Sequence, residues 1–133
     1  MTIKNLIKKA IEAKENSYSP YSKFRVGCAV LTDSGEVFTG CNVENAAFSP
    51  SLCAERNAIS TAIAKGYKSF KAIAITGDSE WTYPCGVCRQ FMKEFFDSTD
   101  IYIVKSETEY RKYKLEDLLP CGFGPDNLNT EEI

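Results

Sequence analysis

The feature that most constrains the fold is a short, mainly apolar run between two helical patterns. Residues 70–76 read FKAIAIT, which is typical of a β-strand buried on both faces of a sheet. Before this run, residues 51–66 repeat apolar side chains at helical spacing, starting at a serine N-cap candidate and ending at a glycine. After it, a second helical pattern follows Pro84 and continues to Phe96. A buried strand flanked by helices predicts an α/β fold.

The rest of the chain adds one helix and further strands. These are an amphipathic helix over residues 3–11, a hairpin of residues 24–32 and 37–43, a strand over 101–106 and a weaker strand over 109–115. The tail holds one helical turn before Pro120 and is otherwise irregular. We therefore predict a single domain, residues 1–133, with three α/β/α layers around a mixed sheet of about five strands.

The charge pattern excludes two broad classes of partner. The formal net charge is -2 and the sixteen Lys and Arg residues are scattered, so no basic stripe is available to bind nucleic acid. Polar residues interrupt the N-terminal 17 residues, and no later window approaches roughly 18 uncharged apolar residues, so we expect no secretory signal and no membrane contact. We expect a cytoplasmic protein whose six cysteines are thiols or metal ligands rather than disulfides.

Both helical patterns around the buried strand begin at cysteines. Cys53 lies at the start of the first, and Cys85 and Cys88 form a Cys-x-x-Cys at the start of the second. Helices that start at the same edge of a sheet can bring three thiols to one ion, and helix N-termini favour the thiolate. Because the chain contains no histidine, the metal ligands must be thiolates or carboxylates. Three ligands and an open fourth position are typical of catalytic zinc, so we predict one Zn²⁺ per chain.

Charged residues follow these cysteines. Glu55 lies two residues after Cys53, where a first-turn glutamate is commonly only a favourable charge at a helix N-terminus. Beside a zinc with an open position, the same carboxylate can move protons between water and substrate, which makes Glu55 the candidate catalytic residue. Arg56 and Arg89 each lie just inside one of the two helices, where they could donate to the sulfurs and offset the thiolate charge.

Two other readings of the cysteines remain open at this point. A structural zinc site would need a fourth thiol, for which Cys121 is the candidate, and would leave no exchangeable water on the metal. A disulfide oxidoreductase would use Cys85 and Cys88 alone, and it would leave Cys53 and Glu55 without a role.

Three separated motifs carry a resemblance to a known family. Cys53-Ala54-Glu55 and Pro84-Cys85-Gly86-Val87-Cys88 match the zinc deaminase signature. The stretches NVENAAFSPSLCAERNAI (42–59), PCGVCRQ (84–90) and LLPCGFGP (118–125) resemble the small homotetrameric cytidine deaminases of pyrimidine salvage, in order and over essentially the whole chain. The resemblance implies a cytidine deaminase-like fold and zinc-dependent hydrolytic deamination of cytidine and deoxycytidine. It also implies a homotetramer whose sites are completed by neighbouring subunits, with a nucleoside as the small-molecule substrate.

The resemblance also assigns roles to individual residues. It implies that Cys53, Cys85 and Cys88 hold zinc and that Glu55 carries protons. It implies five substrate contacts: ribose hydroxyls at Asn42 and Glu44, the base carbonyl at the backbone of Ala54, the pocket wall at Phe24, and a stacking ring from a neighbouring subunit at Phe123.

The chain departs from the family pattern at three positions near the motifs. Phe48 stands where many members have a tyrosine, Tyr83 replaces the usual serine, and Val87 replaces a common alanine. These changes bear on substrate affinity and not on the ligands or the proton carrier.

A deaminase acting on another aminopyrimidine, such as a nucleoside antibiotic, shares the zinc motifs. Asn42, Glu44 and the Phe-Gly-Pro tail favour a plain nucleoside over that alternative. The remaining thiols, at positions 28, 41 and 121, match no ligand position and are expected to be incidental.

Overall fold

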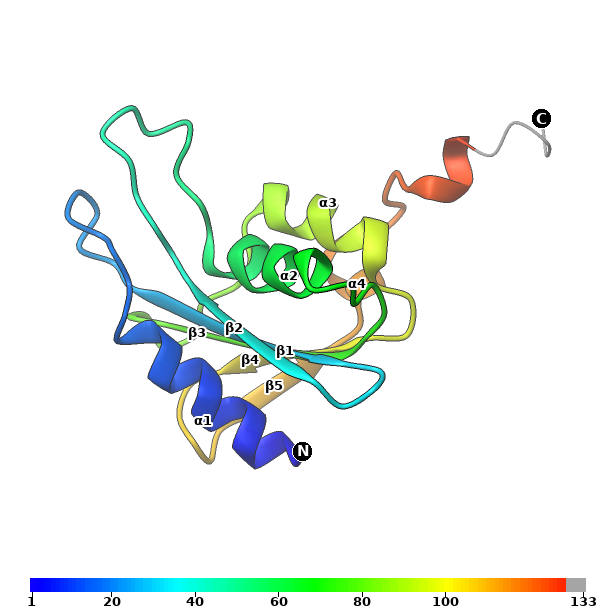
Figure 1. The fold of residues 1–133 in the computed structure, drawn as a ribbon, viewed down its shortest axis with the longest axis horizontal. Coiled ribbons are helices and arrows are strands. Elements are labelled where there is room, and N and C mark those ends of the chain that lie inside the picture. The colour runs from blue at the N-terminus through cyan, green and yellow to red at the C-terminus, as the bar shows by residue number, and fades with distance from the viewer. Residues whose placement is uncertain (129–133) are drawn as a thin grey trace.

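A mixed sheet of five strands lies between one helix on one face and two helices on the other (Figure 1). The computed structural model describes residues 1–128. Its elements in chain order are α1 Ile3–Lys14, β1 Val26–Thr32, β2 Val37–Cys41, α2 Ala54–Ala64, β3 Phe70–Gly77, α3 Gly86–Phe95, β4 Asp100–Val104, β5 Tyr110–Tyr113, α4 Leu115–Leu118 and a 3₁₀ turn, Pro125–Leu128. The predicted three-layer α/β architecture is confirmed.

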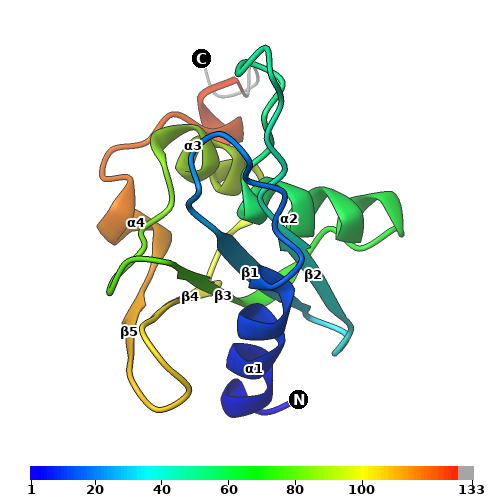
Figure 2. The same cartoon turned by 90° about the vertical axis from the view of Figure 1, so that its left-hand side faces the viewer.

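The sheet has the strand order β2-β1-β3-β4-β5, with β2 and β5 at opposite edges (Figure 2). β1 pairs antiparallel with both β2 and β3, β3 pairs parallel with β4, and β4 pairs antiparallel with β5. All residues of β3 except Lys71 are buried, which confirms the prediction of a strand covered on both faces.

Successive side chains of β3 point to opposite faces of the sheet, and each face has its own hydrophobic core. Ala72 and Ala74 face α1, whose Leu6 and Ile7 are fully buried against the sheet. Small side chains on this face let α1 approach closely: a Cβ on Gly27 of β1 would lie 2.2 Å from the Ala10 carbonyl oxygen. On the other face, the following side chains form a larger core with α2 and α3: Ile59, Met92, Ile73, Ile75, Ile101 and Ile103. Each such side chain stabilises the fold by roughly 1.5–3 kcal/mol.

Both strands of the hairpin are shorter than predicted, because side chains form hydrogen bonds with backbone groups that would otherwise pair between the strands. β1 begins at Val26 and not at Phe24, because the Phe24 carbonyl accepts from the Asn42 side chain and the Arg25 N–H donates to Asp78. β2 likewise ends at Cys41. The expected helical turn before Pro120 is present as α4, whereas the 3₁₀ turn beyond it was not predicted.

Candidate active site

Three cysteines converge where α2 and α3 begin side by side. Cys53 is the N-cap of α2, Cys85 is the N-cap of α3, and Cys88 lies in the first turn of α3. Their sulfurs all lie within 4.8 Å of one another, and Cys53 Sγ is 3.8 Å from Cys85 Sγ. Tetrahedral zinc with Zn–S distances of about 2.3 Å requires sulfurs roughly 3.8 Å apart. The three thiols therefore fit a zinc ion with small adjustments.

The described part of the chain offers this trio no fourth thiol. Among residues 1–128, the only group of three or more potential metal ligands is Cys53, Cys85 and Cys88. Cys121 is exposed and does not belong to it. A three-ligand site with room for one further ligand is the arrangement of catalytic rather than structural zinc.

The surroundings of Cys53 favour its thiolate. The Cys88 thiol donates toward it, and the Arg56 guanidinium also stabilises the negative sulfur, so that the pKa of Cys53 falls to about 5. The interaction with Cys53 and burial both raise the pKa of Cys88, which is the partner that keeps its proton in the absence of metal. The pair thus already contains one ready anionic ligand for a cation.

Glu55 lies in the first turn of α2, next to the cysteine trio. Only 4% of the residue is exposed, although it is a charged residue type. Burial raises the pKa of its carboxyl to about 7, and the nearby Cys53 sulfur adds to that effect. A carboxyl with a pKa near neutrality can both accept and donate a proton at physiological pH, which is the property required of a proton carrier.

A cavity of about 210 Å³ opens beside these groups. Its lining residues come from three places in the chain: Phe24, Val26 and Asn42 from the hairpin; Cys53, Ala54 and Glu55 from the start of α2; Thr82, Tyr83 and Cys85 from the loop before α3. A larger hollow, of about 630 Å³, runs along the outer face of α3 and contains none of the three cysteines. Of these two cavities, only the smaller one is lined by Cys53, Cys85 and Glu55.

Asn42 fixes the hairpin side of this cavity. Its Oδ1 accepts from the Val26 N–H at 2.9 Å and from the Ser17 hydroxyl at 2.5 Å, and its Nδ2 donates to the Phe24 carbonyl at 2.8 Å. One amide N–H of Asn42 is left to donate to a bound molecule. Ser17 and Val26 were not predicted as part of the site, because their contribution depends on contacts between segments distant in the sequence.

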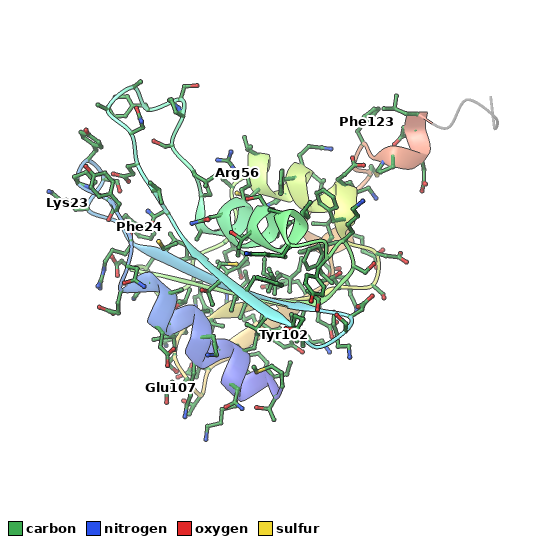
Figure 3. The ribbon with its side chains drawn as sticks, viewed as in Figure 1. Lys23, Phe24, Arg56, Tyr102, Glu107 and Phe123 are labelled. Atoms are coloured by element: carbon green, nitrogen blue, oxygen red, sulfur yellow. The ribbon has the colours of Figure 1, made fainter. Side chains whose placement is uncertain are left out.

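Two predicted substrate contacts lie outside the cavity. The Glu44 carboxylate accepts from the backbone N–H groups of Tyr21 and Ser22, each at 3.0 Å, and from the Ser22 hydroxyl. It lines a neighbouring hollow that also includes the exposed ring of Phe48. Phe123 is 56% exposed and lies on the opposite side of the molecule from Phe24 (Figure 3). This chain therefore does not bring Phe123 to its own cavity.

The two arginines have different partners. Arg56 Nη2 lies 3.5 Å from Cys53 Sγ, as expected of a residue that offsets thiolate charge, and its Nε is buried without a hydrogen-bond partner within residues 1–128. Arg89 differs from the expectation. Its Nε donates to the Pro84 carbonyl at 2.8 Å and its Nη1 to the Leu118 carbonyl at 2.7 Å. The last carbonyls of a helix lack partners within the helix, and Arg89 binds one of those of α4 instead of a sulfur.

Comparison with known proteins places this site in context. Residues 1–105 match the model of the cytidine and deoxycytidylate deaminase zinc-binding region. A cytidine deaminase of Sporosarcina psychrophila is 40% identical over 131 residues, which cover 97% of this chain and 96% of that protein. A probable cytidine deaminase of Dictyostelium discoideum is 42% identical over 128 residues, covering 92% and 86%.

Solved structures agree with these sequence relatives. The crystal structure of cytidine deaminase from Burkholderia pseudomallei superposes with a TM-score of 0.87 at 42% identity, covering 92% of this chain and all of that one. The crystal structure of cytidine deaminase from Mycobacterium tuberculosis gives a TM-score of 0.79 at 37% identity, covering 93% and 99%.

Proposed function

Because the chain belongs to the cytidine and deoxycytidylate deaminase family, we propose that it hydrolyses cytidine and deoxycytidine to the corresponding uracil nucleosides and ammonia. The observation that carries this proposal is the buried Glu55 carboxyl beside three converging thiols at the wall of a small cavity. We further propose that Cys53, Cys85 and Cys88 hold one zinc ion per chain.

Zinc, when bound, supplies a Lewis acid that lowers the pKa of a water molecule and makes it a nucleophile at neutral pH. The Glu55 carboxylate accepts a proton from the attacking water and delivers it to N3 of the pyrimidine, which makes C4 more electrophilic. The hydroxyl group adds to C4. Glu55 then carries the remaining hydroxyl proton to the 4-amino group, and the C4–N bond breaks with release of ammonia. One carboxyl acts as base and as acid, which suits a group whose pKa lies near 7.

The cavity walls support an orientation of the nucleoside. The backbone N–H of Ala54, at the start of α2, donates to the base carbonyl, and the ring packs against Phe24. The free amide N–H of Asn42 donates to a ribose hydroxyl. Glu44 reaches the ribose from the neighbouring hollow, where Tyr21 and Ser22 already hold its carboxylate.

We also propose a homotetramer in which Phe123 completes a neighbouring site. Phe123 is exposed and distant from its own cavity, and both features are necessary for that role. Within residues 1–128, no helix is long and apolar enough to cross a membrane. A cytoplasmic location remains a prediction from the sequence.

The proposal is tested by adding purified protein to cytidine. We expect about one zinc per chain, a fall in the absorbance of cytidine as uridine forms, and an equal amount of released ammonia. A zinc-loaded protein that leaves cytidine and deoxycytidine unchanged would contradict the proposal. In that case, turnover of another aminopyrimidine would favour the related antibiotic-type deaminase, and inertness toward both would favour a structural zinc site.

A further inference from the structure

The loop between β3 and α3, residues 78–84, is tied to the strand at the far edge of the sheet. Trp81 and Tyr83 of the loop meet Arg111 and Tyr113 of β5, and we call these four residues the β5 clamp. The Arg111 guanidinium lies 4.0 Å from the centre of the Trp81 ring. Its Nη1 donates to the Tyr83 hydroxyl at 3.1 Å. The negative face of the indole ring attracts a cation in this position, so the contact holds the loop against β5.

The two tyrosines complete the clamp. Their hydroxyl oxygens lie 2.6 Å apart, and their rings pack edge to face with centroids 5.7 Å apart. Both rings pack against the larger core, so the pair is anchored as well as hydrogen-bonded. A neighbouring ion pair, between Lys105 at the end of β4 and Glu80 of the same loop, adds a further link at 3.1 Å.

The clamped loop forms one wall of the cavity. Thr82 and Tyr83 line it directly, and Cys85 follows two residues later. Thr82 is itself confined, since its hydroxyl lies 2.6 Å from that of Ser79 and its side chain fills the space beside Gly77. The wall therefore cannot recede without breaking the hydrogen bonds and the cation–π contact of the clamp.

The orientation of the base identifies what this wall meets. With N3 at Glu55 and the base carbonyl at Ala54, the C2–N3–C4 edge of the pyrimidine faces the start of α2. Phe24 occupies a face of the ring. C4, the reacting atom, must lie near Cys53 and Cys85, and C5 is bonded to C4. Cys85 continues the wall formed by Thr82 and Tyr83, so this wall is the one that meets C5.

We propose that the β5 clamp makes the Thr82–Tyr83 wall a specificity-determining element that limits the size of the substituent at C5 of the pyrimidine. The proposal rests on the proposed function. The residues of β5 act through Tyr83 and are positioning residues. They do not touch the substrate, and their effect is to keep the wall from yielding to a group larger than hydrogen or fluorine.

The test compares kcat/KM for cytidine, 5-fluorocytidine and 5-methylcytidine in the wild type, Tyr113→Phe and Arg111→Gln. Tyr110→Phe is the matched control, because Tyr110 lies on the same strand and packs against Tyr102 instead of the clamp. We expect the wild type to discriminate against the methyl group and the clamp variants to lose roughly three- to tenfold of that discrimination, the effect of one hydrogen bond. Circular dichroism and zinc per chain should match the wild type.

The ratio between substrates separates a specificity role from general damage, which would lower all three rates alike. Discrimination in both clamp variants within twofold of the wild-type value would overturn the proposal, as would an equal change in Tyr110→Phe. If one clamp variant does not fold, the other carries the test, since Arg111 is exposed. Failure of the wild type to deaminate cytidine would instead refute the proposed function.

Discussion

Replacing Glu55 by glutamine removes the proton carrier while changing almost nothing else. The amide has nearly the same shape as the carboxyl, and the side chain is 4% exposed, so the replacement fits the space already present. None of the three sulfurs belongs to this residue, so the Glu55→Gln variant should keep its zinc. An amide, however, cannot accept a proton from water at neutral pH or deliver one to N3.

The size of the loss follows from the number of proton transfers that Glu55 performs. A positioned acid or base contributes roughly 10²–10⁴ to a rate. Glu55 acts in both directions, first as base toward water and then as acid toward N3 and the amino group. If each direction contributes only the lower value, the combined loss in kcat is about 10⁴, or about 5.4 kcal/mol of barrier. We therefore expect at least this decrease, with little change in the affinity for cytidine.

The assay follows the absorbance of cytidine at several substrate concentrations, so that kcat and KM are obtained separately. Glu116→Gln is the matched control, because Glu116 is exposed on α4 and lies outside the cavity. It should retain wild-type kinetics. A Glu55→Gln variant that keeps its zinc and has a kcat within tenfold of the wild type would refute the assignment of proton transfer to this residue.

Three further predictions concern the metal, the loops around the site and the packing beneath it. Cys85→Ser should lose bound zinc and turnover but keep its fold, because the thiol is exposed. Cys121→Ser should keep both zinc and activity, and measuring zinc per chain distinguishes the two variants. The pKa of Asp78 is held at about 2, first by its hydrogen bond from Arg25, so its stabilising effect is present above about pH 4 and is lost as the pH falls through 2. Urea unfolding of Asp78→Asn should show a loss of about 1 kcal/mol at pH 7, discounted for partial exposure, and almost none near pH 2. Gly40→Ala would place a Cβ 2.5 Å from the Ala58 nitrogen of α2, so it should lower the free energy of unfolding by about 3 kcal/mol; a loss under 0.5 kcal/mol would contradict the close approach of β2 and α2.

The elements that hold the metal ligands were predictable because local patterns encode them. Helical periodicity and caps located α2 and α3, and the apolar run located β3, so the convergence of Cys53 with Cys85 and Cys88 followed from the topology of the sheet. Glu55 was singled out by its position two residues after Cys53, whereas its burial is a finding of the structure.

The contacts between distant segments could not be predicted in the same way. Arg89 binds the Leu118 carbonyl, and Tyr83 binds Tyr113, across separations of about thirty residues. No periodicity or spacing in the sequence encodes such pairs, since they depend on how the loop before α3 and the segment after β4 lie in space. The hairpin strands are shorter than predicted for the same reason. The Asn42 side chain donates to the Phe24 carbonyl, which therefore does not pair with the neighbouring strand.

The central claim is a zinc ion held by three thiolates with an open fourth position, beside one proton-carrying carboxyl. X-ray absorption at the zinc edge of the purified protein tests the first part most directly, because sulfur and oxygen ligands differ in distance and scattering. We predict three sulfurs at about 2.3 Å and one oxygen near 2.0 Å. Four sulfurs, or a zinc signal that survives Cys53→Ala unchanged, would contradict the account.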